Sequence, residues 1–503
     1  MAGISGAPAN AAQPRGVERR LERVPLSTDT VIALFGCLVV FVGDTQSLSL
    51  IPLLSQVEKQ YAMTPTQASW TLSALTIAGA ASAPTLTRLG DRFGMRRLVL
   101  LGLTMGVLGN LLSAVAPGMA VLVIGRAVLG ISAALPLTYA LLRERSPAAH
   151  GTNRGVGIMT AAVGFGVALS FLLSGLVIQS HGSVRTVFWV MTGLALIALI
   201  AGWVILPDTA TRRREDIDYL GAAGVAAGLI CIVLAVSEAN SWGWSSAGII
   251  GLFAAGMVIF AAWVAVELRS DHPMINVRLT FRRTTTPAFI VCGLCSFLAI
   301  YSNLAVATYL ETPRLVGYGL GASVLTTGFY LCPIAVFVMI GGSIAAAVIR
   351  RLGTKWTMAL GGVIIAADFF WFAAAHSAGW EYIVANCLWG LGYSLAFSAG
   401  NSAYLLAARD GEAAMFSSAN TVITTGVAGL GASIFATVLT SKFIPKTPIP
   451  SPDVYTRVWL IAAGAGVAII ILALASASST FKGGTVTAVA DPEEAATAGA
   501  ADQ

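Results

Sequence analysis

Long runs of apolar residues, separated by short polar segments, occupy almost the whole chain of 503 residues. A helix needs about 20 apolar residues to cross a membrane, whereas a membrane β-strand needs about 10 residues of alternating polarity. The runs reach the helical length and do not alternate. Fourteen such runs occur, at residues 31–53, 68–87, 98–116, 119–141, 155–178, 186–206, 219–238, 246–267, 287–310, 322–348, 356–375, 380–405, 413–440 and 457–478. The pattern therefore predicts an all-α integral membrane protein with fourteen transmembrane helices.

The composition agrees with a membrane protein and excludes a water-soluble one. Hydrophobic residues make up 56% of the chain and charged residues 11%, with a mean hydropathy of +0.80, whereas a soluble domain has roughly 25% charged residues. The polar segments are too short for a catalytic domain. They hold neither a phosphate-binding glycine loop nor a metal-ligand spacing. We therefore expect no enzyme, no ATP-driven pump, no cofactor and no metal.

Basic residues are distributed unevenly between the two sides of the expected helices. Of the 30 Lys and Arg residues, 23 lie on the side of the N-terminus, six on the other side, and Arg126 lies inside the fourth run. Basic loops are retained in the cytoplasm, so both termini are expected there. The net charge of +6 thus indicates contact with a lipid bilayer and not with nucleic acid. The excess of Arg over Lys suggests a bacterial cell membrane.

The loop after the second run carries the most specific motif, R-L-G-D-R-F-G-M-R-R at residues 88–97. It resembles the G-x-L-x-D-R-x-G-R-R loop of the major facilitator superfamily, and residues 350–355 resemble that family's second copy. Tight turns are expected at Gly94 and Gly353. The resemblance implies a cytoplasmic gate formed by Asp91, Arg92, Gly94, Arg96 and Arg97. Asp91 is expected to accept hydrogen bonds from nearby arginines.

Three charged residues lie deep within expected spans. Asp44 is in the first span, Asp368 in the eleventh, and Arg126 is part of a segment that resembles the second motif of the same family. A charge in the bilayer core costs at least about 2.5–3.5 kcal/mol, so it normally faces a cavity or a partner. In the facilitator architecture the first and fourth helices of each half line the cavity. The resemblance therefore implies that Asp44 and Arg126 couple transport to protons, with Asp368 as a possible secondary acid; anchoring of Arg126 to nearby carbonyls is the alternative.

Fourteen spans indicate a particular branch of the family. Segments 216–221 and 267–279, which flank spans seven and eight, resemble the fourteen-spanner drug:proton antiporters. That resemblance implies two six-helix bundles, 31–206 and 287–478, related by a pseudo-two-fold axis. The two-helix insertion with its loops spans 207–286, and the tails 1–30 and 479–503 are expected to be disordered. The fifth span reads S-F-L-L-S-G at 170–175 in place of the antiporter G-P-x-x-G-G, which leaves the direction of transport open.

The substrate cavity is expected to include five polar and aromatic residues of spans nine and twelve: Asn303, Tyr309, Asn386, Trp389 and Tyr393. Aromatic rings with a few amides suit an amphipathic organic molecule. The favoured function is proton-coupled efflux of drugs or natural products, which confers antibiotic resistance, by a protein that we expect to be a monomer. The alternatives are proton-coupled uptake or exchange of a small organic solute, and a non-transporting membrane sensor.

Overall fold

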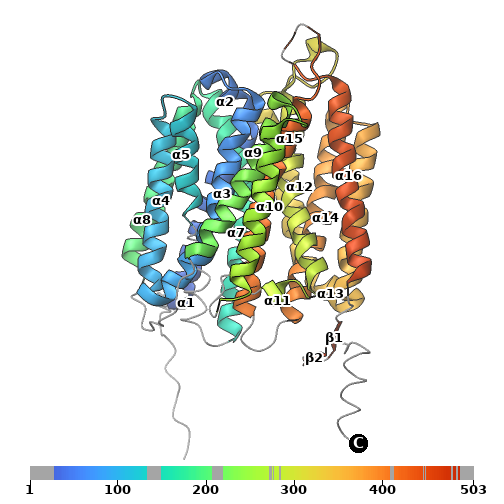
Figure 1. Ribbon diagram of the computed structural model, residues 1–503. Coiled ribbons are helices and arrows are strands. Elements are labelled where there is room, and N and C mark those ends of the chain that lie inside the picture. The colour runs from blue at the N-terminus through green and yellow to red at the C-terminus, as the bar shows by residue number, and fades with distance from the viewer. Residues whose placement is uncertain are drawn as a thin grey trace, which may run out of the picture.

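The computed structural model describes residues 28–132, 149–206, 219–270, 275, 277–282, 285–407, 413–445, 447, 449–476, 480–482 and 485–487. Its elements are α1 (Thr28–Leu48), η1 (Ile51–Leu53), α2 (Leu54–Tyr61), α3 (Pro65–Phe93), α4 (Met95–Ala114), α5 (Met119–Gly130), α7 (Ala149–Gln179), α8 (Val184–Ile205), α9 (Tyr219–Trp242), α10 (Ala247–Glu267), α11 (Val277–Thr280), α12 (Thr286–Glu311), η2 (Arg314–Val316), α13 (Val324–Ala374), α14 (Gly379–Leu406), α15 (Ala413–Leu439), α16 (Pro452–Ala475), β1 (Thr480–Lys482) and β2 (Thr485–Thr487). The long helices run side by side as a bundle (Figure 1). We call the end that holds α2 the distal end and the opposite end, where α16 finishes, the proximal end.

The described helices make this a multi-pass membrane protein. Ten of them are long and apolar enough to cross a bilayer. One of the ten, α13, consists of two helices joined at Gly353, where φ is +82°. The α5 helix and residues 164–179 of α7 are apolar but shorter. The exact count of fourteen spans stays a prediction.

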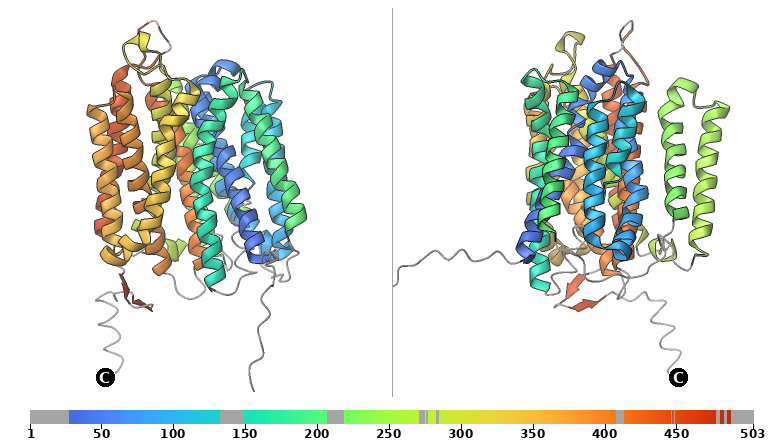
Figure 2. Two further views of the ribbon diagram at one scale, coloured as in Figure 1. Left: turned by 180° about the vertical axis from the view of Figure 1, so that it is seen from behind. Right: turned by 90° about the vertical axis from the view of Figure 1, so that its left-hand side faces the viewer.

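The helices form two groups that meet along two reciprocal seams. Helix α3 packs along α15, and α7 packs along residues 324–352 of α13. Thus the second helix of the first group contacts the fifth helix of the other group, and the fifth helix of the first group contacts the second of the other. A two-fold axis between the groups produces this pairing. Figure 2 shows the two groups standing side by side.

Small residues allow the backbones at these seams to approach closely, as is common between membrane helices. A Cβ atom added at Gly175 would lie 2.3 Å from Leu325 Cα, and one at Gly328 would lie 2.6 Å from the Phe171 carbonyl oxygen. On the other seam, the Ser73 hydroxyl donates a hydrogen bond to the Gly429 carbonyl over 3.0 Å. The two groups are therefore in backbone-level contact.

The expected insertion forms a hairpin of α9 and α10 beside the rest of the molecule (Figure 2, right). Helix α9 covers the α3–α15 seam, where Val225, Leu229 and Val233 are buried with Ile77 and Ala80. Helix α10 packs on α9 and is otherwise largely exposed, with Met257 among its exposed residues. A helix that is apolar all round and has one neighbour fits a lipid-facing position.

Two of the differences from the sequence-based expectation lie at the end of the first span and in the C-terminal tail. The first span was expected to run to residue 53, but α1 ends at Leu48, and Pro52 then sits in the short helix η1; proline lacks the N–H that a continuing helix needs. The segment 479–503, expected to be disordered, contains an antiparallel hairpin of β1 and β2. Residues 133–148, which include the end of the expected fourth span, lie outside the described residues.

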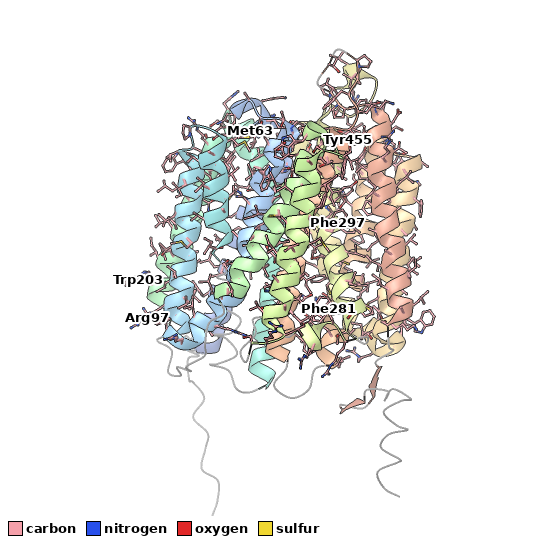
Figure 3. All side chains as sticks on the ribbon, viewed as in Figure 1. Met63, Arg97, Trp203, Phe281, Phe297 and Tyr455 are labelled. Atoms are coloured by element: carbon pink, nitrogen blue, oxygen red, sulfur yellow. The ribbon has the colours of Figure 1, made fainter. Side chains whose placement is uncertain are left out.

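The described part of the chain carries basic residues at both ends of the bundle. Arg97 lies at the proximal end, whereas Met63 and Tyr455 mark the distal end (Figure 3). Lys59, in α2, is among the few basic residues at the distal end.

Candidate functional site

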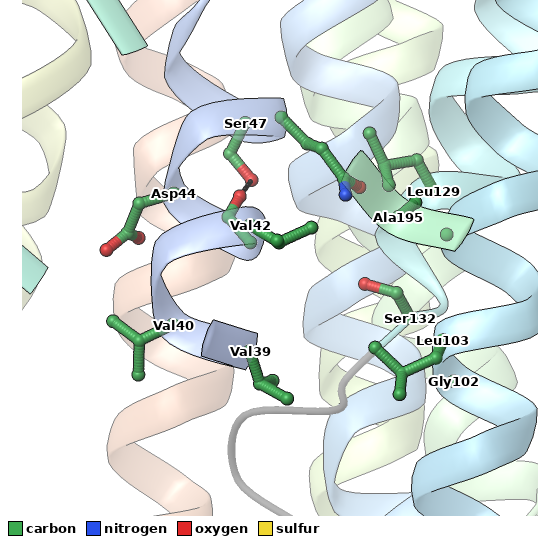
Figure 4. Close-up of a pocket in the computed structure, with 13 residues that line it drawn as sticks. Val39, Val40, Val42, Asp44, Ser47, Gly102, Leu103, Leu129, Ser132 and Ala195 are labelled. Carbon is green, nitrogen blue, oxygen red and sulfur yellow. Dashed lines mark hydrogen bonds between the residues drawn. The ribbon is translucent and has the colours of Figure 1, made fainter. Parts of the chain in front are cut away.

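Asp44 lies in α1, one turn before the helix ends. Its side chain projects to the opposite side of α1 from Leu129, Ser132 and Ala195 (Figure 4). It therefore points away from the interior of its own group, and it lies close enough to Tyr393 of α14 for the two to interact electrostatically. The Asp44 Oδ2 atom is shielded and has no hydrogen-bond partner among the described residues. Asp44 thus lies on the side of α1 that is turned towards the second group.

The surroundings of Asp44 depend on a glycine of α7. A Cβ atom added at Gly166 would lie 3.2 Å from both the Asp44 Cβ and the Phe41 Cα. One residue earlier, Phe165 stacks on Phe41 with ring centroids 5.7 Å apart. The α7 helix therefore approaches α1 closely beside the carboxylate.

Arg126, in α5, is fully buried and donates three hydrogen bonds to backbone carbonyls. Its Nη1 bonds to Gln46 O at 3.0 Å, its Nη2 to Ser47 O at 3.4 Å, and its Nε to Thr71 O at 3.3 Å. The last carbonyls of a helix have no intrahelical partner, and a cation is favourable there. Arg126 therefore caps the end of α1.

The structure does not bring Arg126 and Asp44 into contact. Within the described part of the chain, no ion pair or hydrogen bond joins the two side chains. Three N–H groups of the guanidinium donate to carbonyls, two at the end of α1 and one in α3, so the alternative of anchoring to nearby carbonyls describes this conformation. Electrostatic tuning of Asp44 by Arg126 stays a prediction.

A cavity of about 180 Å³ lies on the other side of α1, within the first group. Val42, Gln46, Gly106, Leu129 and Ser132 are among its lining residues (Figure 4). Asp44 borders this cavity through its position on α1, while its carboxylate points elsewhere. The cavity is too small for a drug-sized molecule, whose sites usually measure about 300–1,000 Å³.

The expected cavity residues of α14 lie on one side of the helix but in different surroundings. Trp389 and Tyr393 are in contact, with ring centroids 5.5 Å apart. Trp389 packs on Phe369 inside the second group, whereas Tyr393 stacks on Phe397 and lies near Asp44. Of the expected cavity residues of α14, Tyr393 is therefore the one that lies near Asp44.

The other expected cavity residues serve different contacts. The Asn386 Nδ2 donates to the Tyr330 carbonyl at 2.6 Å, which joins α14 to α13. Asn303 is buried in α12, and its Oδ1 has no hydrogen-bond partner among the described residues. Tyr309 belongs to an aromatic cluster at the distal end, 5.0 Å from the Tyr455 ring and next to His376. Of these three, Asn303 is the residue with a shielded side-chain oxygen that lacks a partner among the described residues.

Asp368 is enclosed within the second group. It is 2% exposed, and its Oδ1 has no hydrogen-bond partner among the described residues. The next residue, Phe369, packs on Trp389 of α14 and Trp459 of α16. These contacts place Asp368 among the helices of the second group and away from Asp44.

The proximal motif loop is a single-residue turn. Gly94 has φ +101° and joins the end of α3 to the start of α4, a conformation that glycine adopts without strain. The Arg96 Nη2 donates to the Trp203 carbonyl of α8 at 3.0 Å, and the Arg92 guanidinium lies over the adjacent Phe93 ring; Arg97 is exposed. The side chain of Asp91, the expected acceptor, lies outside the described side chains.

One polar contact between the groups carries no sequence motif. The Ser55 hydroxyl of α2 donates a short hydrogen bond to Glu311 Oε2 at the end of α12. Glu58, one turn after Ser55, lies within electrostatic range of the same carboxylate. From the sequence, a glutamate at a helix end that is followed by a proline is expected to be exposed to solvent. The fold shows that α2 covers Glu311.

Comparisons with known proteins agree with this architecture. The sequence model of the Major Facilitator Superfamily matches residues 34–435. The tetracenomycin C resistance and export protein of Streptomyces glaucescens is 27% identical over 60% of this chain and 55% of its own length. The multidrug resistance protein Stp of Mycobacterium tuberculosis is 26% identical over 80% of this chain and 75% of its own. The chain spans about half the length of several curated relatives that it matches.

Solved structures share the fold at low sequence identity. A peptide transporter in complex with sulfate superposes with a TM-score of 0.64 at 16% identity, covering 88% of this chain and 94% of that one. The human organic anion transporter MFSD10 gives 0.58 at 15% identity, covering 89% and 98%. The family match over most of the length shows that the chain belongs to the Major Facilitator Superfamily, whose members are transporters and not enzymes.

Proposed function

We propose that this protein exports amphipathic drugs or natural products in exchange for protons, by alternating access in a bacterial plasma membrane. Curated relatives from two bacteria are named for multidrug resistance or for antibiotic resistance and export. Fourteen spans with both termini in the cytoplasm agree with the arginine-rich proximal end. The distal end then faces the outside.

The observation that carries the proposal is the position of Asp44. Its carboxylate lies on the side of α1 turned towards the second group, near Tyr393, and one oxygen lacks a hydrogen-bond partner among the described residues. An unpaired charge in the membrane interior is costly, so protonation or a cationic ligand stabilises this group. Alternation between these two states is what exchange of a proton for a substrate requires.

Arg126 has a supporting role in this scheme. By capping the end of α1 it fixes the helix turn that carries Asp44. The cap also places a positive charge at the break between α1 and η1. Arg126 is thus proposed as a positioning residue for the proton carrier.

Uptake or exchange of a small solute is the second candidate, since α7 continues through residues 170–175 without the proline of the antiporter motif. Reconstituted protein in vesicles with an imposed pH gradient distinguishes the two. Export in exchange for protons predicts that an acidic interior drives accumulation of amphipathic compounds from a test panel. Accumulation that requires the opposite gradient would establish uptake together with protons, and accumulation that ignores the gradient would exclude coupling.

A further inference from the structure

The α9–α10 hairpin lies beside one of the two seams between the groups (Figure 2, right). Helix α9 packs against both α3 of the first group and α15 of the second. Leu229 of α9 lies where these helices meet. A Cβ atom added at Gly426 of α15 would lie 3.0 Å from the Leu229 Cδ1 and 3.8 Å from the Ala80 Cβ of α3. The hairpin therefore contacts both sides of a seam that must change if the two groups move.

At the distal end, hydrogen bonds attach α9 to the second group. The Asn240 Nδ2 donates to the Thr437 carbonyl at 2.6 Å and to the Thr440 Oγ1 at 3.0 Å. The Asn240 Oδ1 accepts a bond from the Trp244 Nε1 at 3.2 Å. The Thr437 Oγ1 donates in return to the Val236 carbonyl at 2.7 Å. Hydrogen bonds require a defined distance and angle, so these contacts fix the position of α9 along α15.

At the proximal end, the chain that leaves α10 is packed into the second group. The Glu267 Oε2 accepts a hydrogen bond from the Ile275 N–H at 3.3 Å. Ile275 is 3% exposed and belongs to the same buried cluster as Phe289 of α12. The Thr285 hydroxyl, at the start of α12, donates to the Thr280 carbonyl of α11 at 3.0 Å. The described part of this connection thus holds the proximal end of the hairpin against α12.

The contact of α9 with α3 is of a different kind. Val225, Leu229 and Val233 are buried there with Ile77 and Ala80 of α3. Apolar contacts have no preferred direction, so the two surfaces can slide past each other as long as they stay covered. Transporters built from two bundles alternate their access largely by rigid-body rocking of one bundle against the other. Sliding of α3 along α9 permits that motion, whereas separation of α9 from α15 would break hydrogen bonds.

We propose that the α9–α10 hairpin moves with the second group and that α3 slides along α9 whenever the two groups rock. Helix α9 then covers the α3–α15 seam in both arrangements and keeps lipid away from it. The inference rests on the alternating access of the proposed function and is independent of the substrate, the direction of transport and the coupling ion.

Two disulfides that start from the same residue of α9 test this assignment. Leu229→Cys is combined either with Ala80→Cys, which ties α9 to α3, or with Gly426→Cys, which ties α9 to α15. The full-length background has its six native cysteines replaced by alanine. Copper phenanthroline forms the disulfides, and mass spectrometry of unreduced peptides measures their yield. We expect the tie to α3 to lower turnover in vesicles at least about tenfold, because it blocks a conformational step, with recovery on reduction. The tie to α15 should leave turnover unchanged.

The other outcomes of this experiment contradict the proposal. Loss of turnover with the tie to α15 alone would assign the hairpin to the first group. Loss with both ties would show that the hairpin moves relative to both groups. Loss with neither tie would show that α3 does not slide along α9.

Spin labels measure the same motion if a disulfide does not form or a variant does not fold. The labels replace three exposed residues, Met257 of α10, Ile197 of α8 and Ile471 of α16. The distances are measured at low and high pH, with and without a transported compound. The Met257–Ile471 distance should stay constant, whereas the Met257–Ile197 distance should change together with the Ile197–Ile471 distance. A Met257–Ile471 distance that changes as much as the Ile197–Ile471 distance would overturn the proposal.

The readout separates this inference from the proposed export function, because turnover is counted in either direction and with or without a pH gradient. Turnover that ignores the gradient, together with the expected effects of the two ties, would remove proton-coupled export and leave the hairpin assignment standing. Gradient-driven export that neither tie affects would do the reverse.

Discussion

Asp44 and Asp368 hold nearly the same place in the sequence pattern and different places in the molecule. Each lies in the middle part of an expected span that runs towards the distal end, and each has a carboxylate oxygen without a described hydrogen-bond partner. Asp44 lies on the side of α1 turned towards the second group, near Tyr393, whereas Asp368 is packed inside the second group, beside a residue that contacts Trp389 and Trp459. The depth of an acidic residue in the membrane therefore does not show whether it can couple transport to protons. The helices that surround the residue decide this.

The largest effect is expected from a substitution at Gly166, because the absence of a side chain there leaves room beside Asp44. A leucine there would push against Phe41 and the Asp44 Cβ, both already 3.2 Å from the position of an added Cβ. We expect gradient-driven transport per folded protein to fall at least about tenfold, as expected when a reacting group is displaced by about 1 Å.

Gly193→Leu in α8 is the control, because an added Cβ at Gly193 meets nothing within 4 Å. Transport is measured in vesicles at matched protein content. Full activity of Gly166→Leu would show that the space beside Asp44 is not used.

The second prediction concerns Arg126, whose guanidinium bonds to carbonyls at the end of α1 and not to the Asp44 carboxylate. Arg126→Gln removes a buried cap and leaves carbonyls of Gln46, Ser47 and Thr71 without that donor. We expect the free energy of unfolding in detergent to fall by about 2–4 kcal/mol.

Arg185→Gln is the matched control, since Arg185 also donates to a carbonyl, that of Ala116, but is exposed. Its effect on stability should be much smaller. If Arg126→Gln keeps full stability and instead changes only the pH profile of transport, Arg126 acts on Asp44 and not as a cap.

The smallest expected effect concerns His376 of the second group, whose side chain we interpret as structural. His376 follows α13 and donates from Nδ1 to the Phe372 carbonyl at 2.8 Å. Burial lowers the pKa of His376 below its ordinary value of 6.5, against smaller raising contributions from the Phe372 carbonyl and Glu381.

Because the unfolded chain binds this proton more readily, His376 costs stability as the pH falls from about 6.5 through the folded-state pKa. We expect a loss below about 1 kcal/mol between pH 7.5 and 5.5, which His376→Gln should abolish without altering transport. The exposed His181, replaced by Asn because its φ is +62°, is the control. A larger change in transport than in stability would assign His376 to the transport cycle.

Much of the fold could be predicted from the sequence, because apolar length and basic loops are local properties. The turns at Gly94 and Gly353 were predicted for the same reason, and both have positive φ. The role of Arg126 could not be read from its motif, because its partners are carbonyls of α1 and α3, set by helix packing. The Ser55–Glu311 contact spans 256 residues, and no pattern around either residue indicates it.

The most direct test of the central claim is the proton that Asp44 is proposed to carry. A transported compound is added to purified protein in weakly buffered solution, and proton release is followed with a pH indicator. We predict release of about one proton per bound molecule in the parent protein, no release in Asp44→Asn, and unchanged release in Asp368→Asn. Release that persists in Asp44→Asn and disappears in Asp368→Asn would contradict the account.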